Sequence, residues 1–305
     1  MDASPWGWLG VAGGGPKVNA ANQEVSEDAE FVDLYSRLGF HMSQRLNEDI
    51  SAFAQLEWRF TGDEQNTSQG FNEVRQSYLG VQSNRFGTLQ AGNFNGLYYQ
   101  FVSAPFDVYL DRGLQFSSSN LQSRGDSIGY YTPEWKGFTT FAQVKHYSER
   151  GSAETGAGSE IAAQGGIQYQ GKSFRIGVGA VDDSVRGNGN GEVLYGVIGS
   201  YQVSDSLSLR LGSEWQTRSG QYGGGYDTVG LGGLYVVGPW AFTADYYRID
   251  RDDQDDSHAW AAGTYYKLSS AFNVFVELAD NDAPGIRHGN GLSDAYWVSG
   301  ARYMF

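Results

Sequence analysis

Hydrophobic and polar side chains alternate at a period of two along most of the chain, as expected of β-strands with one apolar and one polar face. In the segment 54–60, Leu56 and Trp58 fall on one side of such a strand, whereas Glu57 and Arg59 fall on the other. The same alternation recurs at residues 32–42, 174–180, 207–216, 240–247, 272–278 and 297–305. The pattern predicts an all-β protein.

Short turns and longer polar loops alternate between these segments. Seven short turns are predicted at residues 46–49, 84–87, 134–137, 170–172, 204–206, 238–239 and 269–270. Eight longer loops are predicted at residues 14–28, 62–71, 94–125, 148–158, 183–191, 217–225, 250–256 and 281–293. Fifteen connections imply sixteen strands, with about 19 residues for each strand and its connection, as in transmembrane barrels.

Periodicity alone does not tell an apolar face that meets lipid from one that meets the core of a soluble β-sandwich. Three features favour lipid: the even strand count with short and long connections alternating, the charged residues in mid-strand, and the aromatic residues at strand ends. Open sheet edges are not tolerated in lipid, so the sheet must close on itself. A soluble β-lectin or adhesin remains the alternative.

Composition agrees with a sheet protein and narrows its partners. The chain has 43 Gly, 17 Phe, 20 Tyr and 8 Trp but only 6 Pro, which suits pleated sheet and turns. A net charge of -14 argues against a nucleic-acid partner. There is no cysteine to form a disulfide or a thiolate metal site. The first four residues lack the features of a signal peptide, so Met1 is expected to replace a removed leader.

Six short motifs in a fixed order carry a family resemblance. They are Ser-Arg-Leu-Gly-Phe (36–40), Gln-Leu-Glu (55–57), Val-Arg-Gln-Ser-Tyr-Leu-Gly (74–80), Arg-Phe-Gly-Thr-Leu-Gln-Ala-Gly (85–92), Asp-Ser-Ile-Gly-Tyr-Tyr-Thr-Pro (126–133) and Lys-Gly-Phe (136–138). With the terminal Phe305, the chain resembles the general trimeric porins of Gram-negative bacteria, the sixteen-stranded type of proteobacteria outside the enteric group. The resemblance implies one transmembrane antiparallel β-barrel domain over residues 1–305, with short periplasmic turns and long extracellular loops.

Two departures from the family pattern leave ion selectivity open. Asn93 follows Gly92 where the family often has arginine, and the long loop lacks an acidic Pro-Glu-Phe-Gly-type signature. Neither departure disturbs the predicted fold.

The longest connection, residues 94–125, is the first functional candidate, because structureless loops of this length are usually functional. The resemblance implies that this third loop folds into the barrel and narrows it, with residues 98–101 and 105–112 at the constriction. Its many aromatic residues favour a loop packed against the wall over a mobile surface loop, which is the alternative.

Seven charged residues are candidates for the pore constriction: Arg37, Arg59, Arg75, Asp107, Asp111, Arg112 and Arg124. Arg37 and Arg75 match basic wall positions of the family, and basic groups facing loop carboxylates would create a transverse field that filters solutes by charge. In the alternative interpretation, the arginines pair with Glu57, Glu73 or Asp33 and mainly stabilise the wall. Additional basic lumen candidates are Lys145, Arg175, Arg210 and Lys267.

We therefore expect a channel for passive diffusion of ions and small hydrophilic solutes, located as a homotrimer in the outer membrane of a Gram-negative bacterium. The resemblance also implies that Phe305 is read by the outer-membrane assembly machinery. A substrate-specific channel for oligosaccharides or for aromatic or organic acids is the alternative, with a sliding surface at Tyr98, Tyr99, Phe101, Phe106 and Tyr109.

Other chemistry has little support in the sequence. The four histidines show no metal-ligand spacing, and no nucleophile elbow or phosphate-binding loop is present, so neither an enzyme nor a cofactor is expected. The acidic loop at 250–256 lacks the spacing of a calcium loop and is expected to be solvated.

Overall fold

The computed structural model describes residues 2–15, 17–18, 24–26, 29–62, 71, 73–110, 116, 122–147, 160–187, 189–221, 223–252, 255–279 and 296–305. Among these residues, no helix is long and apolar enough to cross a membrane.

Nearly all regular structure is β-sheet. The first half contains β1 (Asp2–Gly15), β4 (Glu30–Asp33), β5 (Arg37–Arg45), β6 (Ile50–Arg59), β7 (Glu73–Ser83), β8 (Gly87–Asn93), β9 (Asp126–Tyr131) and β10 (Phe138–Tyr147). The second half contains β11 (Glu160–Gln170), β12 (Phe174–Asp182), β13 (Val193–Gln202), β14 (Leu207–Gln216), β15 (Tyr226–Val237), β16 (Trp240–Arg251), β17 (Ser257–Lys267), β18 (Phe272–Ala279) and β19 (Tyr296–Met304). The remaining elements are the small hairpin of β2 (Lys17–Val18) and β3 (Glu24–Ser26) and the short helical segments η1 (Tyr99–Ser103), η2 (Ala104–Phe106) and η4 (Val185–Gly187).

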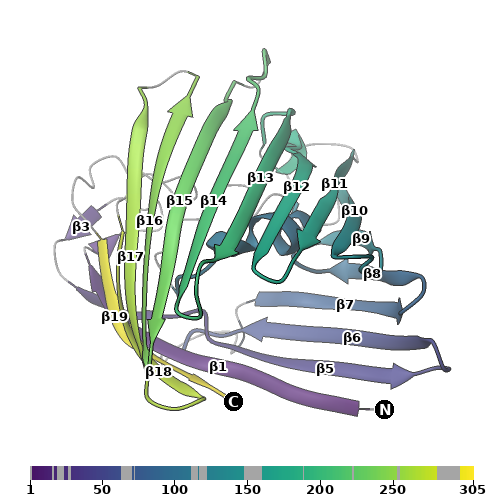
Figure 1. Ribbon diagram of the computed structural model, residues 1–305, viewed down its shortest axis with the longest axis horizontal. Helices are drawn as coiled ribbons and strands as arrows, with labels where there is room; N and C mark the ends of the chain where they lie inside the picture. The colour runs from purple at the N-terminus through teal and green to yellow at the C-terminus, as the bar shows by residue number, and fades with distance from the viewer. Residues whose placement is uncertain are drawn as a thin grey trace.

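Each barrel strand pairs antiparallel with its neighbours in the chain, and the last strand returns to the first (Figure 1). β1 pairs with β19 from Trp8 opposite Met304 to Gly15 opposite Trp297. The pairing reaches the last residue, because Gly7 donates its N–H to the Phe305 carbonyl (3.0 Å) and Phe305 donates its N–H to the Gly7 carbonyl (3.1 Å). The sheet is therefore closed, and the end of the chain is bonded.

The strand count agrees with the prediction. Seventeen strands form the sheet, but β4 and β5 both pair with β1 and are separated only by residues 34–36. They are two parts of one interrupted strand, which leaves sixteen. The seven short and eight long connections lie between the strands near the predicted places, but β1 extends to Gly15 and β16 to Arg251, past the predicted starts of two loops, and the β2–β3 hairpin lies within the first. The sixteen-stranded closed barrel is confirmed, and the soluble sandwich is wrong.

Apolar side chains point outward over most of the barrel, and polar side chains point inward except where the inner wall packs against the third long connection. In β14, Leu209, Leu211 and Trp215 are exposed, whereas Arg210 and Glu214 are buried. Closing the sheet gives the outward face no protein partner, so the exposed apolar residues form a belt that suits a lipid environment.

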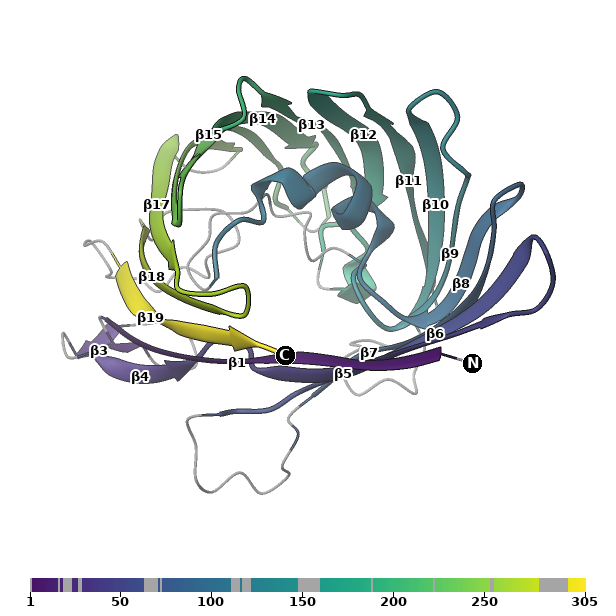
Figure 2. The same cartoon turned by 60° about the horizontal axis from the view of Figure 1, so that its bottom comes forward.

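The third long connection enters the barrel. Figure 2 shows the segment that carries η1 and η2 crossing the interior, and η1 contacts β11, β12 and β13. The interior is thus divided between a wall that holds this loop and a wall that faces it.

The closure between β1 and β19 predicts a sensitive position at Gly7. A Cβ added at Gly7 would collide with the Arg37 carbonyl oxygen and would lie 2.9 Å from the Phe305 ring. We expect Gly7→Ala to lower the free energy of unfolding by about 1–3 kcal/mol, because backbone must shift to make room. Urea unfolding of the refolded protein, followed by tryptophan fluorescence, measures this effect.

Gly220→Ala is the matched control, since nothing lies within 4 Å of a Cβ at Gly220. Equal unfolding midpoints for the two variants would contradict the role of Gly7 in closure.

Candidate pore constriction

Aromatic and aliphatic burial holds the inserted loop against the wall. Loop residues Phe94, Leu97, Tyr98, Val102, Phe106 and Phe116 are almost fully buried and share one apolar cluster with wall residues Phe141, Val181, Ile198 and Tyr247. Phe106 packs edge-on against Phe116 at 4.8 Å between ring centroids. Burial of side chains this large stabilises the docked loop by roughly 1.5–3 kcal/mol each.

Two buried glutamine side chains of the wall accept hydrogen bonds from backbone N–H groups in the first turn of the loop's helical segment. The first N–H groups of a helix have no partner within the helix. Here Leu97 donates its N–H to the side-chain oxygen of Gln143 (2.8 Å), and Tyr98 donates to that of Gln164 (2.7 Å). Without these two glutamines the docked loop would bury unpaired donors, which is costly.

Further along the loop, carboxylates and a carbonyl of the wall continue this anchoring. The Tyr98 hydroxyl donates to Glu214 (3.2 Å), the Leu110 N–H donates to Glu277 (2.5 Å), and the Tyr109 hydroxyl donates to the Ala261 carbonyl (3.1 Å). The loop is therefore bonded to β11, β14, β17 and β18 as well as to β10.

Glycines on the inner wall make room for the loop backbone. A Cβ at Gly177 would collide with the Phe101 carbonyl and would lie 2.7 Å from the Val102 Cα. A Cβ at Gly196 would collide with the Tyr98 hydroxyl. The loop approaches β12 and β13 closely because these two positions carry no side chain.

On the facing wall, a buried glutamate binds two arginines. The Glu57 carboxylate is fully buried and accepts hydrogen bonds from Arg37 (2.8 Å), Arg75 (2.8 Å) and Gln76 (2.5 Å). The register between β6 and β7 shifts here, since Glu57 is opposite Gln76 and Trp58 is opposite Val74, which leaves Arg75 as an extra residue. This bulge lets neighbouring residues Arg75 and Gln76 both reach Glu57.

A second glutamate binds the other two candidate arginines. Arg59 lies 3.3 Å from the Glu73 carboxylate, and Arg124 donates to the other oxygen of the same carboxylate. Arg37 and Arg59 are opposite each other in the register of β5 and β6, so the two groups are adjacent.

We call the set Arg37, Glu57, Arg59, Glu73, Arg75 and Arg124 the arginine cluster. It contains four cations and two carboxylates, which leaves two positive charges in excess. The arginines do pair with Glu57 and Glu73, as the wall-stabilising alternative proposes. Asp33 instead accepts N–H groups from Ser36 and Gly62.

The loop carries a carboxylate bonded to Tyr99, a residue on which the charge of this cluster acts. Tyr99 donates its hydroxyl to the exposed Asp107. Burial and the Asp107 carboxylate raise the pKa of Tyr99, whereas the charges of Arg75 and Arg37 act in the opposite direction. Tyr99 thus lies within electrostatic reach of both arginines and stays a protonated donor at ordinary pH. Asp111 and Arg112 lie outside the described residues.

The additional basic candidates have different surroundings. Arg210 is buried and bound to Asp245 (2.6 Å) and to the Thr243 hydroxyl (2.5 Å), and its guanidinium lies 5.6 Å from the centre of the Phe106 ring. Arg210 therefore contacts the loop from the wall to which the loop is docked. Lys145 lies over the Tyr147 ring, and Lys267 is exposed at the end of β17.

The aromatic residues of the loop do not form an open sliding surface. Tyr98, Phe106 and Tyr109 are buried, and Phe101 stacks on Phe141 at 5.1 Å. Of the five, Tyr99 is the residue on which the charges of Arg75 and Arg37 act. The wall residues that bind the loop, Gln143, Gln164, Glu214 and Glu277, are not identifiable from the sequence. A polar side chain on the lumen side of a strand gives the same sequence pattern whether it contacts water or a docked loop.

Comparison with known proteins agrees with this architecture. The family model described as Gram-negative porin matches residues 10–285. The chain belongs to the Gram-negative porin family. Among curated relatives, Outer membrane porin C 2 of Shigella flexneri serotype 5a is 31% identical over 181 residues, covering 57% of this chain and 43% of the relative. The match therefore spans less than half the length of that porin.

Solved porin structures show the same fold over the whole chain. The Salmonella typhi OmpF complex with daunomycin has a TM-score of 0.77 at 14% identity and covers 99% of this chain and 97% of that one. The anion-selective porin from Comamonas acidovorans has a TM-score of 0.76 at 20% identity and covers 100% of this chain and 99% of that one. At these identities the likeness concerns the porin fold alone.

Because the loop lies directly on Gly177, we expect Gly177→Ala to lower single-channel conductance. The added methyl pushes the loop backbone off the wall and toward the pore axis. Planar-bilayer recording of single channels measures the change. Gly233→Ala is the control, because the nearest atom to a Cβ at Gly233 is 3.5 Å away. A Gly177→Ala conductance equal to or above that of the parent protein would contradict the contact between the loop backbone and Gly177.

Proposed function

We propose that the protein is a channel of the Gram-negative outer membrane through which ions and small hydrophilic solutes diffuse passively. Membership of the porin family and the closed sixteen-stranded barrel support a channel. The inserted loop supports a constriction, since it is held to one wall by buried apolar contacts and hydrogen bonds. The buried aromatic residues of the loop favour general diffusion over a channel with an aromatic sliding surface.

The constriction prefers anions in this proposal. The observation that carries it is the arginine cluster with its two excess positive charges. Arg75 and Arg37 of this cluster act electrostatically on Tyr99, which donates its hydroxyl to Asp107 of the loop. Cations on one wall and a carboxylate on the other create a transverse field, and the excess cations raise the local concentration of anions.

We further infer a homotrimer, oriented with its short turns at the periplasmic end and its long loops outside. The family resemblance supports both inferences. Phe305 is proposed as the residue read by the outer-membrane assembly machinery, since its ring is exposed while its backbone closes the barrel.

Neutralising the arginines tests the selectivity. We expect Arg37→Gln and Arg75→Gln, singly and combined, to shift the reversal potential in a salt gradient toward cation preference, because each removes one charge from the cluster. Arg85→Gln is the matched control, since Arg85 is exposed in the turn after β7. Reversal potentials that match the control would rule out the proposed role of these arginines.

A variant that removes a negative charge distinguishes an electrostatic effect on selectivity from a change in the structure of the wall. Glu57→Gln keeps the shape of the side chain but removes a negative charge beside Arg37 and Arg75. We expect it to shift the reversal potential toward stronger anion preference. A shift in the same direction as Arg75→Gln would mean that altered wall structure, not charge, sets the selectivity.

A further inference from the structure

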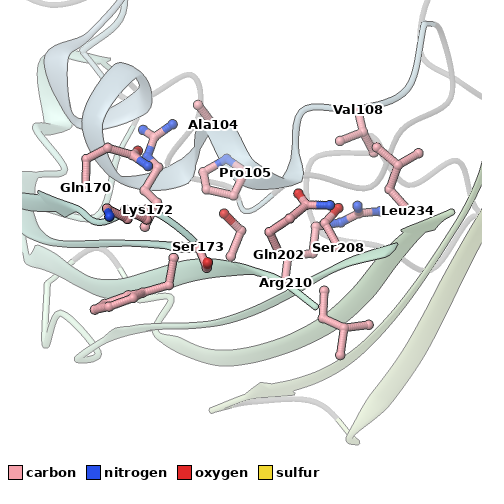
Figure 3. Close-up of a pocket in the computed structure, with 14 residues that line it drawn as sticks. Ala104, Pro105, Val108, Gln170, Lys172, Ser173, Gln202, Ser208, Arg210 and Leu234 are labelled. Atoms are coloured by element: carbon pink, nitrogen blue, oxygen red, sulfur yellow. The ribbon is translucent and has the colours of Figure 1, made fainter. Parts of the chain in front are cut away.

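A cavity lies behind the inserted loop, between η2 and the inner wall near the short-turn end of the barrel. Figure 3 shows Ala104, Pro105 and Val108 of the loop on one side and wall residues such as Gln202 and Ser208 on the other. Its volume is about 430 Å³, within the range of sites for small organic ligands. It is separate from the arginine cluster, which belongs to β5–β7 and the end of the loop.

The register of the strands aligns polar side chains along this cavity. Arg175 is opposite Ser200, and Ser200 is opposite Arg210, so these three form one row across β12, β13 and β14. Gln202 and Ser208 are opposite each other in the next row toward the short turns. Because successive inward residues are two apart, both rows face the loop.

The cavity has positive charge that the wall does not neutralise. Arg210 is matched by Asp245 at 2.6 Å. Arg175, in contrast, donates to the Gln100 carbonyl (2.6 Å), and its Nε is buried without a hydrogen-bond partner. Within the part of the chain that the structure describes, neither Arg175 nor Lys172 takes part in an ion pair. Both line the cavity.

Apolar groups complete the lining. Pro105 and Val108 come from the loop, and Leu234 comes from β15. Guanidinium groups bind carboxylates with particular strength because their N–H donors match the two carboxylate oxygens. The hydroxyl and amide groups of the two rows add donors for the same oxygens. A ligand that fits this cavity therefore has an anionic group that contacts Arg175 and Lys172 and an apolar part that contacts the apolar residues of the lining.

We propose that this cavity is a binding site for small organic carboxylates with an apolar body. The inference rests on the proposed function, because an open channel delivers such solutes to the site. The carboxylate lies against Arg175 and the Lys172 ammonium, and the body lies between Pro105 and Leu234. A solute held there stays in the channel longer than one that only passes the arginine cluster.

Calorimetric titration of the full chain in detergent with sodium benzoate tests the site without requiring conduction. Saturable binding is expected, with no detectable binding of benzyl alcohol, which lacks the charge, and weaker binding of acetate, which lacks the apolar body. Arg175→Gln and Lys172→Gln should each weaken benzoate binding by about tenfold, the effect of losing a charged hydrogen-bond donor. Lys136→Gln is the matched control, since Lys136 is an exposed lysine in another short turn.

Benzoate affinity that is unchanged in both variants would place the binding elsewhere and overturn the proposal. Equal binding of acetate and benzoate would overturn the role of the apolar side. The Lys172→Gln variant changes an exposed turn residue, so its result stands even where Arg175→Gln does not fold.

Conductance of the same preparations separates the two proposals. Ion conduction without benzoate binding overturns the site alone, whereas benzoate binding without conduction overturns the channel function alone.

Discussion

The closure of the sheet is the constraint on which the rest of the structure depends. A strand edge in lipid leaves its N–H and C=O groups without partners, so sixteen strands are stable there only when the last pairs with the first. The bonds between β1 and β19, continued to Phe305, supply that pairing. Once the ring is closed, the alternation of side chains decides everything else: one parity must tolerate lipid, and the other lines the interior.

The interior is too wide to be filled by the inward side chains alone, and the third loop occupies part of it. Docking of the loop has one favourable and one unfavourable energetic effect. Apolar side chains such as Phe94 and Phe106 gain stability from burial, but the backbone that carries them brings polar groups into the same space. Gln143 and Gln164 resolve this conflict by accepting the first N–H groups of the segment. Gly177 and Gly196 allow the close approach that makes these bonds possible.

The docked loop divides the lumen into two electrostatic environments. On the facing wall, four arginines share two carboxylates, so their positions are held by ion pairs while a net positive charge remains. Pairing and field are therefore not alternatives, because the same Glu57 that orients Arg37 and Arg75 neutralises only one of them. On the wall behind the loop, Arg210 is neutralised by Asp245, whereas Arg175 has no ion-pair partner among the described residues. The two walls thus differ in how much charge remains available to a solute.

The sequence by itself determined the barrel. Period-two alternation, fifteen alternating connections and the aromatic end at Phe305 are local features, and they predict sixteen closed strands because lipid excludes the alternatives. It also placed Arg37, Arg59 and Arg75 on the inner wall. Only the tertiary structure decided what these residues contact. The bulge that lets Arg75 and Gln76 both bond Glu57, the pairing of arginines with Glu57 and Glu73, and the burial of Tyr98 and Phe106 all depend on residues far apart in the chain. Alternation tells which face a side chain takes, but it carries no information on which loop will come to lie against that face.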